Sequence, residues 1–210
     1  KLGDLSANSC VLPRPHAESS RPEASAPDGT PVTMENIFDD LITRFRAGSP
    51  DRRRADLMFI AVPNTEAVAA LTHMKQYWGF THLVFFTAVD IIERSLFRLT
   101  YMLHSYEAGL DVCIQADISR DAPVADSIHH LWAAASTYER ELKEMFGIEF
   151  PGCPRVDEPF ALEGWDDIPP MRRDFDTREY SERTYFPREG RRKHDKVELM
   201  KQELYPEVDL

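Results

Sequence analysis

Apolar residues recur along the first part of the chain at the spacing of helices and buried strands. From Met34 to Ala47 they fall on one face of a helix, at Ile37, Phe38, Leu41, Ile42 and Phe45. The continuous apolar run from Leu57 to Val62 predicts a buried strand. A second helix is expected after Pro63, with Gly79 at its end. Its apolar stripe consists of Val68, Leu71, Met74 and Trp78.

The next part of the chain has the pattern of a sheet. The run from His82 to Val89 is rich in Val, Phe and Leu, and it would lie parallel to the first strand across the intervening helix. Apolar and polar residues then alternate from Phe97 to Leu103 and from Leu110 to Ile118, which predicts two antiparallel strands with one polar face. On this alternation Cys113 falls on the polar face.

A last helical stripe leads into a segment rich in proline. The stripe consists of Leu131, Ala135, Tyr138, Leu142 and Met145. Asp126 or Ser127 would cap this helix at its start, and Gly147 would end it. The prolines that follow forbid a further helix, so we expect an extended segment. The predicted fold class is therefore α+β. A small mixed four-stranded sheet carries helices in the order α-β-α-β-β-β-α, and a long extended Pro-rich C-terminal arm follows.

These patterns divide the chain into three parts. Residues 1–33 form a Pro-rich N-terminal extension, residues 34–150 the α+β domain, and residues 151–210 the arm. The extension has too little apolar area to fold alone, so we expect a neighbouring subunit to hold it. The arm should likewise become ordered only on its partner, and a short helix is expected in it from Asp195 to Leu204.

The run of residues from helix to arm is specific enough to identify a family. It reads Tyr138-Glu139-Arg140-Glu141, Glu144-Met145-Phe146-Gly147-Ile148, Phe150, Gly152-x-Pro154, Gly164 and Pro170-x-Arg172-x-Asp174-Phe175. This run resembles the thirty-kilodalton (C) subunit of respiratory complex I and the equivalent subunit of membrane-bound energy-converting NiFe hydrogenases. The similarity covers Leu57 to Phe175, and its element order agrees with the one predicted from the periods.

The resemblance implies a non-catalytic subunit of the peripheral arm of such an enzyme, at the cytoplasmic face of the membrane. It would bind the large catalytic subunit, which holds the quinone pocket or the NiFe centre, beside the small iron–sulfur subunit and a ferredoxin-like cluster subunit. The complex would pass electrons from NADH or ferredoxin to quinone or protons. The family has His where Cys153 stands, and this departure favours the hydrogenase-like branch. No cofactor is expected in this chain itself.

Large apolar and charged side chains near the helix and on the arm are the candidates for partner binding. Aromatic and sulfur-containing anchors dominate binding energy once they are desolvated, and Arg fixes register through paired hydrogen bonds. The candidates are Glu139, Arg140, Glu141, Phe160, Trp165, Met171, Arg172, Arg173, Asp174 and Phe175. On the helix, Glu139 with Lys143 and Arg140 with Glu144 have the spacing of exposed ion pairs.

Composition narrows the classes of function. The chain has 25 Lys and Arg against 36 Asp and Glu, a net charge of −11, which repels nucleic acid. No apolar run is long enough to span a bilayer, so membrane contact would come through partner subunits. The three cysteines are too few and too scattered to hold an iron–sulfur cluster. No Gly-rich loop follows the first strand, so nucleotide binding lacks support.

Two alternatives from other classes stay open. One is a free-standing small metal-dependent hydrolase that uses Glu139, Glu141 and His130. Neighbouring histidines such as His129 and His130 point about 100° apart on a helix, however, whereas a zinc pair needs i, i+4 spacing. The other alternative is an adaptor with disordered tails and several exchangeable partners.

Overall fold

The computed structural model describes residues 24–185, and it confirms the α+β fold class. The helix expected at 195–204 and the first 23 residues of the N-terminal extension lie outside the described residues. The elements, in order, are α1 (Met34–Phe45), β1 (Asp51–Arg52), β2 (Leu57–Ala61), α2 (Asn64–Gln76), β3 (His82–Ile91), the 3-10 turn η1 (Ile92–Arg94), β4 (Leu96–Ser105), β5 (Leu110–Ser119), α3 (Ala135–Phe146) and α4 (Thr177–Thr184).

The strands form one mixed sheet of five, in the order β1-β2-β5-β4-β3. β2 pairs with β5 in parallel, and the other neighbours are antiparallel. It follows that β3 runs in the same direction as β2, as predicted, although two strands lie between them. The prediction of four strands was one too few. The extra strand β1 has only two residues, too short to leave a period in the sequence.

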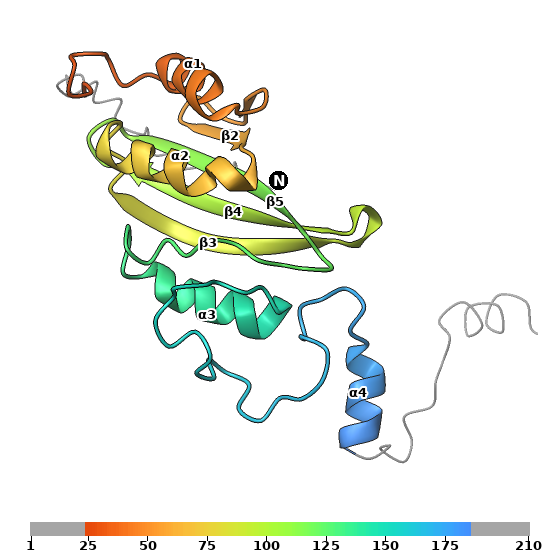
Figure 1. Cartoon of the computed structure of the whole chain (residues 1–210). Helices are drawn as coiled ribbons and strands as arrows, with labels where there is room; N and C mark the ends of the chain where they lie inside the picture. Colours follow the sequence, from red (N-terminus) through yellow and green to blue (C-terminus); the bar gives the residue numbers. More distant parts are fainter. Residues whose placement is uncertain (1–23, 186–210) are drawn as a thin grey trace, which may run out of the picture.

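One face of the sheet forms the core. Alternate residues of β4 are buried against alternate residues of β5, with Phe97, Leu99, Tyr101 and Leu103 opposite Ile118, Ala116, Ile114 and Val112. Phe146 of α3 meets Phe97 edge to face, with 5.9 Å between ring centroids. Figure 1 shows α1 and α2 beside the β2 end of the sheet and α3 beside β3. The predicted alternation in these strands is therefore confirmed.

The opposite face of the sheet is less polar than predicted. Cys113 lies on this face, but only 1% of its surface is exposed. In register beside it are Phe59 of β2 and Met102 of β4, so an apolar row crosses the centre of the face. Burial raises the pKa of the Cys113 thiol to about 11. The alternation of apolar and polar residues placed Cys113 on the correct face. It could not show that the neighbours of Cys113 on the adjacent strands are large and apolar.

Residues 24–33 pack on the domain itself. Ser25 and Pro31 form an isolated antiparallel bridge, and Ala26 between them is 5% exposed. The Tyr77 hydroxyl donates a 2.5 Å hydrogen bond to the Asp28 carboxylate. This part of the N-terminal extension is therefore held by its own chain, whereas a neighbouring subunit had been expected to hold it.

Leu142→Asp should prevent folding. Leu142 is 2% exposed on the buried side of α3, where an unpaired charge costs more than about 3 kcal/mol. Thr137→Asp, at an exposed position in the first turn of the same helix, should change stability by no more than about 0.5 kcal/mol. Thermal melting followed by circular dichroism compares the two. A Leu142→Asp protein that melts within a few degrees of the parent would contradict the assigned core face.

Candidate partner-binding site

Helix α3 begins later than its apolar stripe suggested, and one of the two expected capping residues, Ser127, bonds to a side chain of the helix instead. The helix spans Ala135–Phe146, and neither Asp126 nor Ser127 caps it. The fully buried Glu139 carboxylate instead accepts hydrogen bonds from the Ser127 hydroxyl at 2.5 Å and from the Ile128 amide at 2.8 Å. Glu139 thus joins the loop before the helix to the helix itself.

Of the two i, i+4 ion pairs expected on α3, Glu139 with Lys143 does not form, and Arg140 interacts with Glu144 through its charge without a direct hydrogen bond. Glu139 is buried and cannot reach solvent as part of a surface pair. The Lys143 ammonium binds Glu149 at 2.8 Å and Asp157 at 2.5 Å, both of which lie beyond the helix. The Arg140 guanidinium donates to the carbonyl oxygens of residues 158 and 159, at 3.3 and 2.8 Å. The polar side of α3 therefore binds the arm of the same chain.

Glu144 is the main contact between α3 and the arm. Its two carboxylate oxygens accept the amides of Phe160, Ala161 and Leu162 at 2.7 to 3.0 Å. Desolvation disfavours the charged form, but these three amides outweigh it and lower the pKa of Glu144. Three successive amides on one carboxylate hold this turn of the arm in a single conformation.

A second contact between the domain and the arm lies at the far end of β3. The Asp90 side chain is 1% exposed and accepts both the Nε and an Nη of Arg120, at 3.0 and 3.2 Å. It also accepts the backbone amide of Arg173, in the arm, at 2.9 Å. Arg120 in turn binds Asp174 at 2.7 Å, and this ion pair lowers the pKa of Asp174. Three segments distant in sequence meet at Asp90.

Arg172 and Arg173 contact the domain rather than pointing away from it. Arg172 donates its Nε to the Phe146 carbonyl at 2.6 Å, and its guanidinium lies 5.4 Å from the Phe97 ring centroid. Arg173 pairs with Glu93 at 2.5 Å. The sequence had suggested that these arginines bind partner carboxylates, but in the structure their hydrogen bonds are made within the chain.

An aromatic cluster joins the arm to helix α4. Trp165 packs on Phe175 and Tyr180, with centroid distances of 5.4 and 4.8 Å. The chain then forms α4, which the prediction of an extended arm had missed. Asp176 caps this helix by accepting the amides of Arg178 and Glu179, so a local N-cap overrides the weak apolar pattern.

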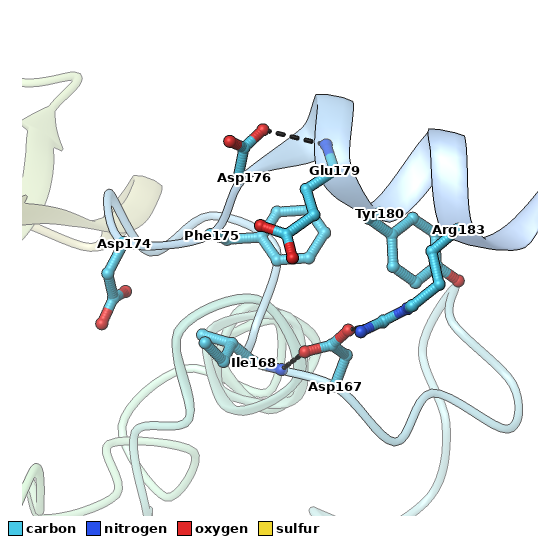
Figure 2. A pocket seen from close by; sticks show the side chains of 8 residues that line it. All are labelled: Asp167, Ile168, Asp174, Phe175, Asp176, Glu179, Tyr180 and Arg183. Atoms are coloured by element: carbon cyan, nitrogen blue, oxygen red, sulfur yellow. Dashed lines mark hydrogen bonds and ion pairs between the residues drawn. The ribbon is translucent and has the colours of Figure 1, made fainter. Parts of the chain in front are cut away.

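Two hollows flank this part of the arm. One, of about 360 Å³, lies between α3 and the arm, and Arg140, Lys143, Leu162 and Trp165 are among its lining residues. The other, of about 190 Å³, is lined by the residues drawn in Figure 2: Asp167, Ile168, Asp174, Phe175, Asp176, Glu179, Tyr180 and Arg183. Figure 2 shows Asp167 bonded to both the Ile168 amide and Arg183, so the carboxylate there already has partners.

The candidate residues fall into three groups. Glu139 is buried, and Arg140, Trp165, Arg172, Arg173, Asp174 and Phe175 bind or pack within the chain. Phe160 and Met171 are exposed, at 41% and 58%. Glu141 is half-buried, and the residues that the structure describes offer it no hydrogen bond or ion pair. The arrangement orders the arm and leaves a few apolar side chains facing outward.

Two residues that bind the arm, Asp90 and Arg120, were missed in the sequence. Asp90 lies on the same side of β3 as the buried residues Phe86 and Ala88. A carboxylate on the core side of a strand needs a buried partner. That signal was available in the sequence. Nothing in the sequence pointed to Arg120 as this partner, because it follows the last strand in an irregular loop.

Cys153 lies in the arm close to α3 and is 7% exposed. Burial first, and then the nearby Glu139, raise the pKa of its thiol to about 12. In the part of the chain that the structure describes, no three His, Cys, Asp or Glu side chains gather in a way that could hold a metal ion. The Glu139 carboxylate, proposed for the hydrolase alternative, is occupied by Ser127 and Ile128.

Comparison with known proteins shows that the chain is similar to one protein family. The sequence profile described as "Respiratory-chain NADH dehydrogenase, 30 Kd subunit" matches residues 60–181. The C subunit of the NADH-quinone oxidoreductase of Moorella thermoacetica is 30% identical over 145 residues, which are 68% of this chain and 95% of that protein. The C/D subunit of the NADH-quinone oxidoreductase of Pseudomonas fluorescens is 37% identical over 82 residues, 39% of this chain and 14% of that protein.

A solved structure shows the same fold. A chain of the membrane-bound sulfane sulfur reductase, described as an archaeal respiratory membrane complex, aligns with a TM-score of 0.64 at 24% identity. The alignment covers 77% of this chain and 96% of that one. These comparisons define the class of the protein as a subunit of a complex I-type oxidoreductase. Within that class, the chain belongs to the family of the 30-kDa subunit of the respiratory-chain NADH dehydrogenase.

Gly147→Ala should loosen the arm, and Gly79→Ala should not. Both glycines have φ of +74°, so each alanine adds about 1–2 kcal/mol of left-handed strain. Only at Gly147 would the new Cβ meet the arm, 2.8 Å from an Arg172 Nη and 3.2 Å from Pro169. At Gly79 nothing lies within 4 Å. Limited proteolysis of the arm should accelerate in Gly147→Ala alone. Equal cleavage rates in the two variants would contradict the contact.

Glu144→Gln should release the turn at residues 160–162. The neutral amide oxygen is a weaker acceptor than a carboxylate, and each charge-assisted bond is worth about 1.5–3 kcal/mol. Amide hydrogen exchange at Phe160, Ala161 and Leu162 should therefore accelerate at least tenfold. Glu141→Gln on the same helix serves as the control and should leave the exchange unchanged.

The same turn should also open in acid. Because the pKa of Glu144 is lowered in the folded state, its contribution is complete above the ordinary value of 4.5 and is lost as the pH falls through the folded pKa. Exchange at 160–162 that is insensitive both to Glu144→Gln and to this drop in pH would refute the role of the carboxylate.

Proposed function

We propose that this chain is a non-catalytic docking subunit on the peripheral arm of a membrane-bound complex I-type oxidoreductase. It would bind the large catalytic subunit, beside the small iron–sulfur subunit and the ferredoxin-like cluster subunit, at the cytoplasmic face of the membrane. Family membership supports the place in such a complex. Among residues 24–185, no helix is both long and apolar enough to cross a bilayer. Membrane attachment would come through the partner subunits.

The observation that best supports the proposal is that the polar side chains of the candidate site are hydrogen-bonded within the chain. Glu139, Glu144, Asp90 and Arg120 all have hydrogen-bond partners within the chain that fix the arm or its supporting helix. Groups used for positioning in this way are engaged before any substrate arrives. Such an arrangement suits a rigid adaptor between larger subunits better than a centre for acid–base chemistry.

The name of the Pseudomonas fluorescens relative supports the choice of partner. That protein carries the double letter C/D, and the matched residues form only 14% of it. Two subunit letters for one protein suggest that a C-type domain and a D-type domain are direct neighbours. We infer that the corresponding large subunit is the neighbour of this chain. The names of the relatives favour the quinone-reducing branch, whereas Cys153 in place of His had favoured the hydrogenase branch.

Co-expression of the full chain with the large subunit of its complex tests the proposal. We expect the two to copurify in a fixed stoichiometry, measured by native mass spectrometry. Nickel analysis of the large subunit then separates the two branches. The isolated chain should have no hydrolase activity that depends on Glu141 or His130, measured on Glu141→Gln and His130→Gln variants. A large subunit that never binds this chain, or an isolated chain with such activity, would contradict the proposal.

A further inference from the structure

One face of the sheet is more exposed than the other. The side chains on this face alternate along each strand with those that point into the core, and we call it the outer face. Phe59, Phe85 and Met102 on the outer face are half-buried, whereas Leu99 and Ile114 on the core face are fully buried. The large side chains of the outer face are therefore accessible to another molecule.

The strand register arranges the outer face in rows that cross the sheet from β2 through β5 and β4 to β3. Residues in one row are cross-strand neighbours, so each row is continuous. The central row consists of Phe59, Cys113, Met102 and Phe85. On one side of it lies the row of Leu57, Asp111, His104 and His82; on the other side follow the row of Ala61, Gln115, Thr100 and Thr87 and then the row of Asp117, Arg98 and Val89.

Both carboxylates in these rows are paired with a basic neighbour in the same row. Asp117 accepts the Nε and an Nη of Arg98, at 2.7 and 2.8 Å, and Asp111 bonds to the Nδ1 of His104 at 2.7 Å. In each pair the carboxylate belongs to β5 and the basic group to β4. These rows therefore present no unpaired carboxylate, although the chain as a whole has a net charge of −11.

This order of charges makes the outer face complementary to itself. A two-fold axis that runs along the strands between β4 and β5 would stack two outer faces on one another, as in the aligned packing of two sheets. Rotation about this axis keeps each row at its own height and exchanges β4 with β5. Arg98 then lies over the partner's Asp117, and His104 lies over the partner's Asp111. Each carboxylate thus faces a basic side chain of the partner as well as one of its own chain.

The central row fits the same symmetry. Phe59 lies over the partner's Phe85, and Cys113 lies over the partner's Met102, so that ring meets ring and sulfur meets sulfur. Offset or edge-to-face contacts between aromatic rings are favourable beyond the area that they bury. The half-buried side chains of this row lose their remaining contact with water in both copies, which favours association.

From this geometry we infer that the outer face binds a second copy of this chain in a two-fold symmetric dimer. β3, β4 and β5 have ten residues each. With strands about 4.8 Å apart and a rise of about 3.4 Å per residue, the face offers roughly 600 Å² per copy. Two such faces exceed the total of about 1,000 Å² that a specific interface needs. A partner of another kind would have to match both charge pairs, because a buried charge without a partner is costly, whereas a second copy matches them by symmetry.

The dimer does not depend on the proposed function. α3 and the arm lie on the core side of the sheet, where Phe146 and Arg172 both contact Phe97. The large subunit can therefore bind the arm while the outer face stays free. Two assembled complexes can then pair through this subunit.

Sedimentation equilibrium of the isolated full chain tests for the dimer. The mass should rise from 24.2 kDa toward twice this value as the concentration increases. Met102→Glu places an unpaired carboxylate at the centre of the interface and should weaken the dimer by about tenfold or more. Ile42→Glu adds the same charge at an exposed apolar position on α1. This control should dimerise like the parent.

A mixing experiment tests the symmetry itself. Arg98→Asp leaves two acidic side chains in its row, and Asp117→Arg leaves two basic ones, so each variant alone should dimerise about tenfold more weakly or worse. In an equimolar mixture the acidic row of one variant lies over the basic row of the other, and the dimer should form again. Sedimentation velocity of the two variants, separate and mixed, measures this recovery.

Three results would overturn the inference. The first is a full chain that stays monomeric at about 100 μM. The second is a dimer that is as stable with Met102→Glu as with Ile42→Glu, because such a dimer uses another surface. The third is a mixture of the two charge variants that dimerises no better than either alone. Circular dichroism of each variant shows that it is folded, and none of these results bears on binding of the large subunit.

Discussion

The buried carboxylate of Asp90 is the group on which the arrangement of the arm depends. A charge with so little exposure is tolerated only when its partners replace the lost water. Arg120 supplies two of these hydrogen bonds and the Arg173 amide supplies another. The end of β3, the loop after β5 and the arm are therefore tied together. Removing one partner of such a buried pair costs about 3–5 kcal/mol, a large share of the stability of a domain of this size.

Helix α3 completes this arrangement because one of its sides binds the loop before the helix and the other side binds the arm. Glu139 points inward and fixes the loop that precedes the helix. Glu144 and Arg140 point toward the arm and bind its backbone. A helix placed in this way between domain and arm fixes the orientation of both. The exposed side chains of Phe160 and Met171 thus keep a defined position relative to the sheet, which suits the proposed docking role.

Much of the domain could be predicted from sequence, because periodic burial decides the larger helices and strands. We read correctly the strand β2, the alternation in β4 and β5, and the stripe in α1 apart from Ile42, which is exposed. The start of α3 was not read correctly, and Ser127, one of its two predicted caps, binds the Glu139 carboxylate instead. The same holds for α4, whose N-cap at Asp176 was overlooked among charged residues. Where a single side chain decides where a helix begins, the spacing of the apolar residues does not show that boundary.

The contacts that the candidate residues make within the chain were not predicted. Arg172, Arg173 and Asp174 were predicted to bind a partner subunit, whereas the groups that they bind in the structure, on Phe146, Glu93 and Arg120, lie far away in the sequence. Pairing between distant polar groups depends on the three-dimensional fold, and neither spacing nor composition reveals it. A charged residue can face a partner subunit or its own domain, and the sequence alone does not distinguish the two.

Amide hydrogen exchange of the isolated full-length chain tests the central claim most directly. If the chain holds its own arm, the amides of Met171 and Arg173, which donate to the Met145 carbonyl and to Asp90, should be protected in the absence of any partner. Protection close to that of the strand β4 is the predicted result. Exchange of these two amides at the rate of an unfolded peptide, with protection only in the presence of the large subunit, would contradict the account.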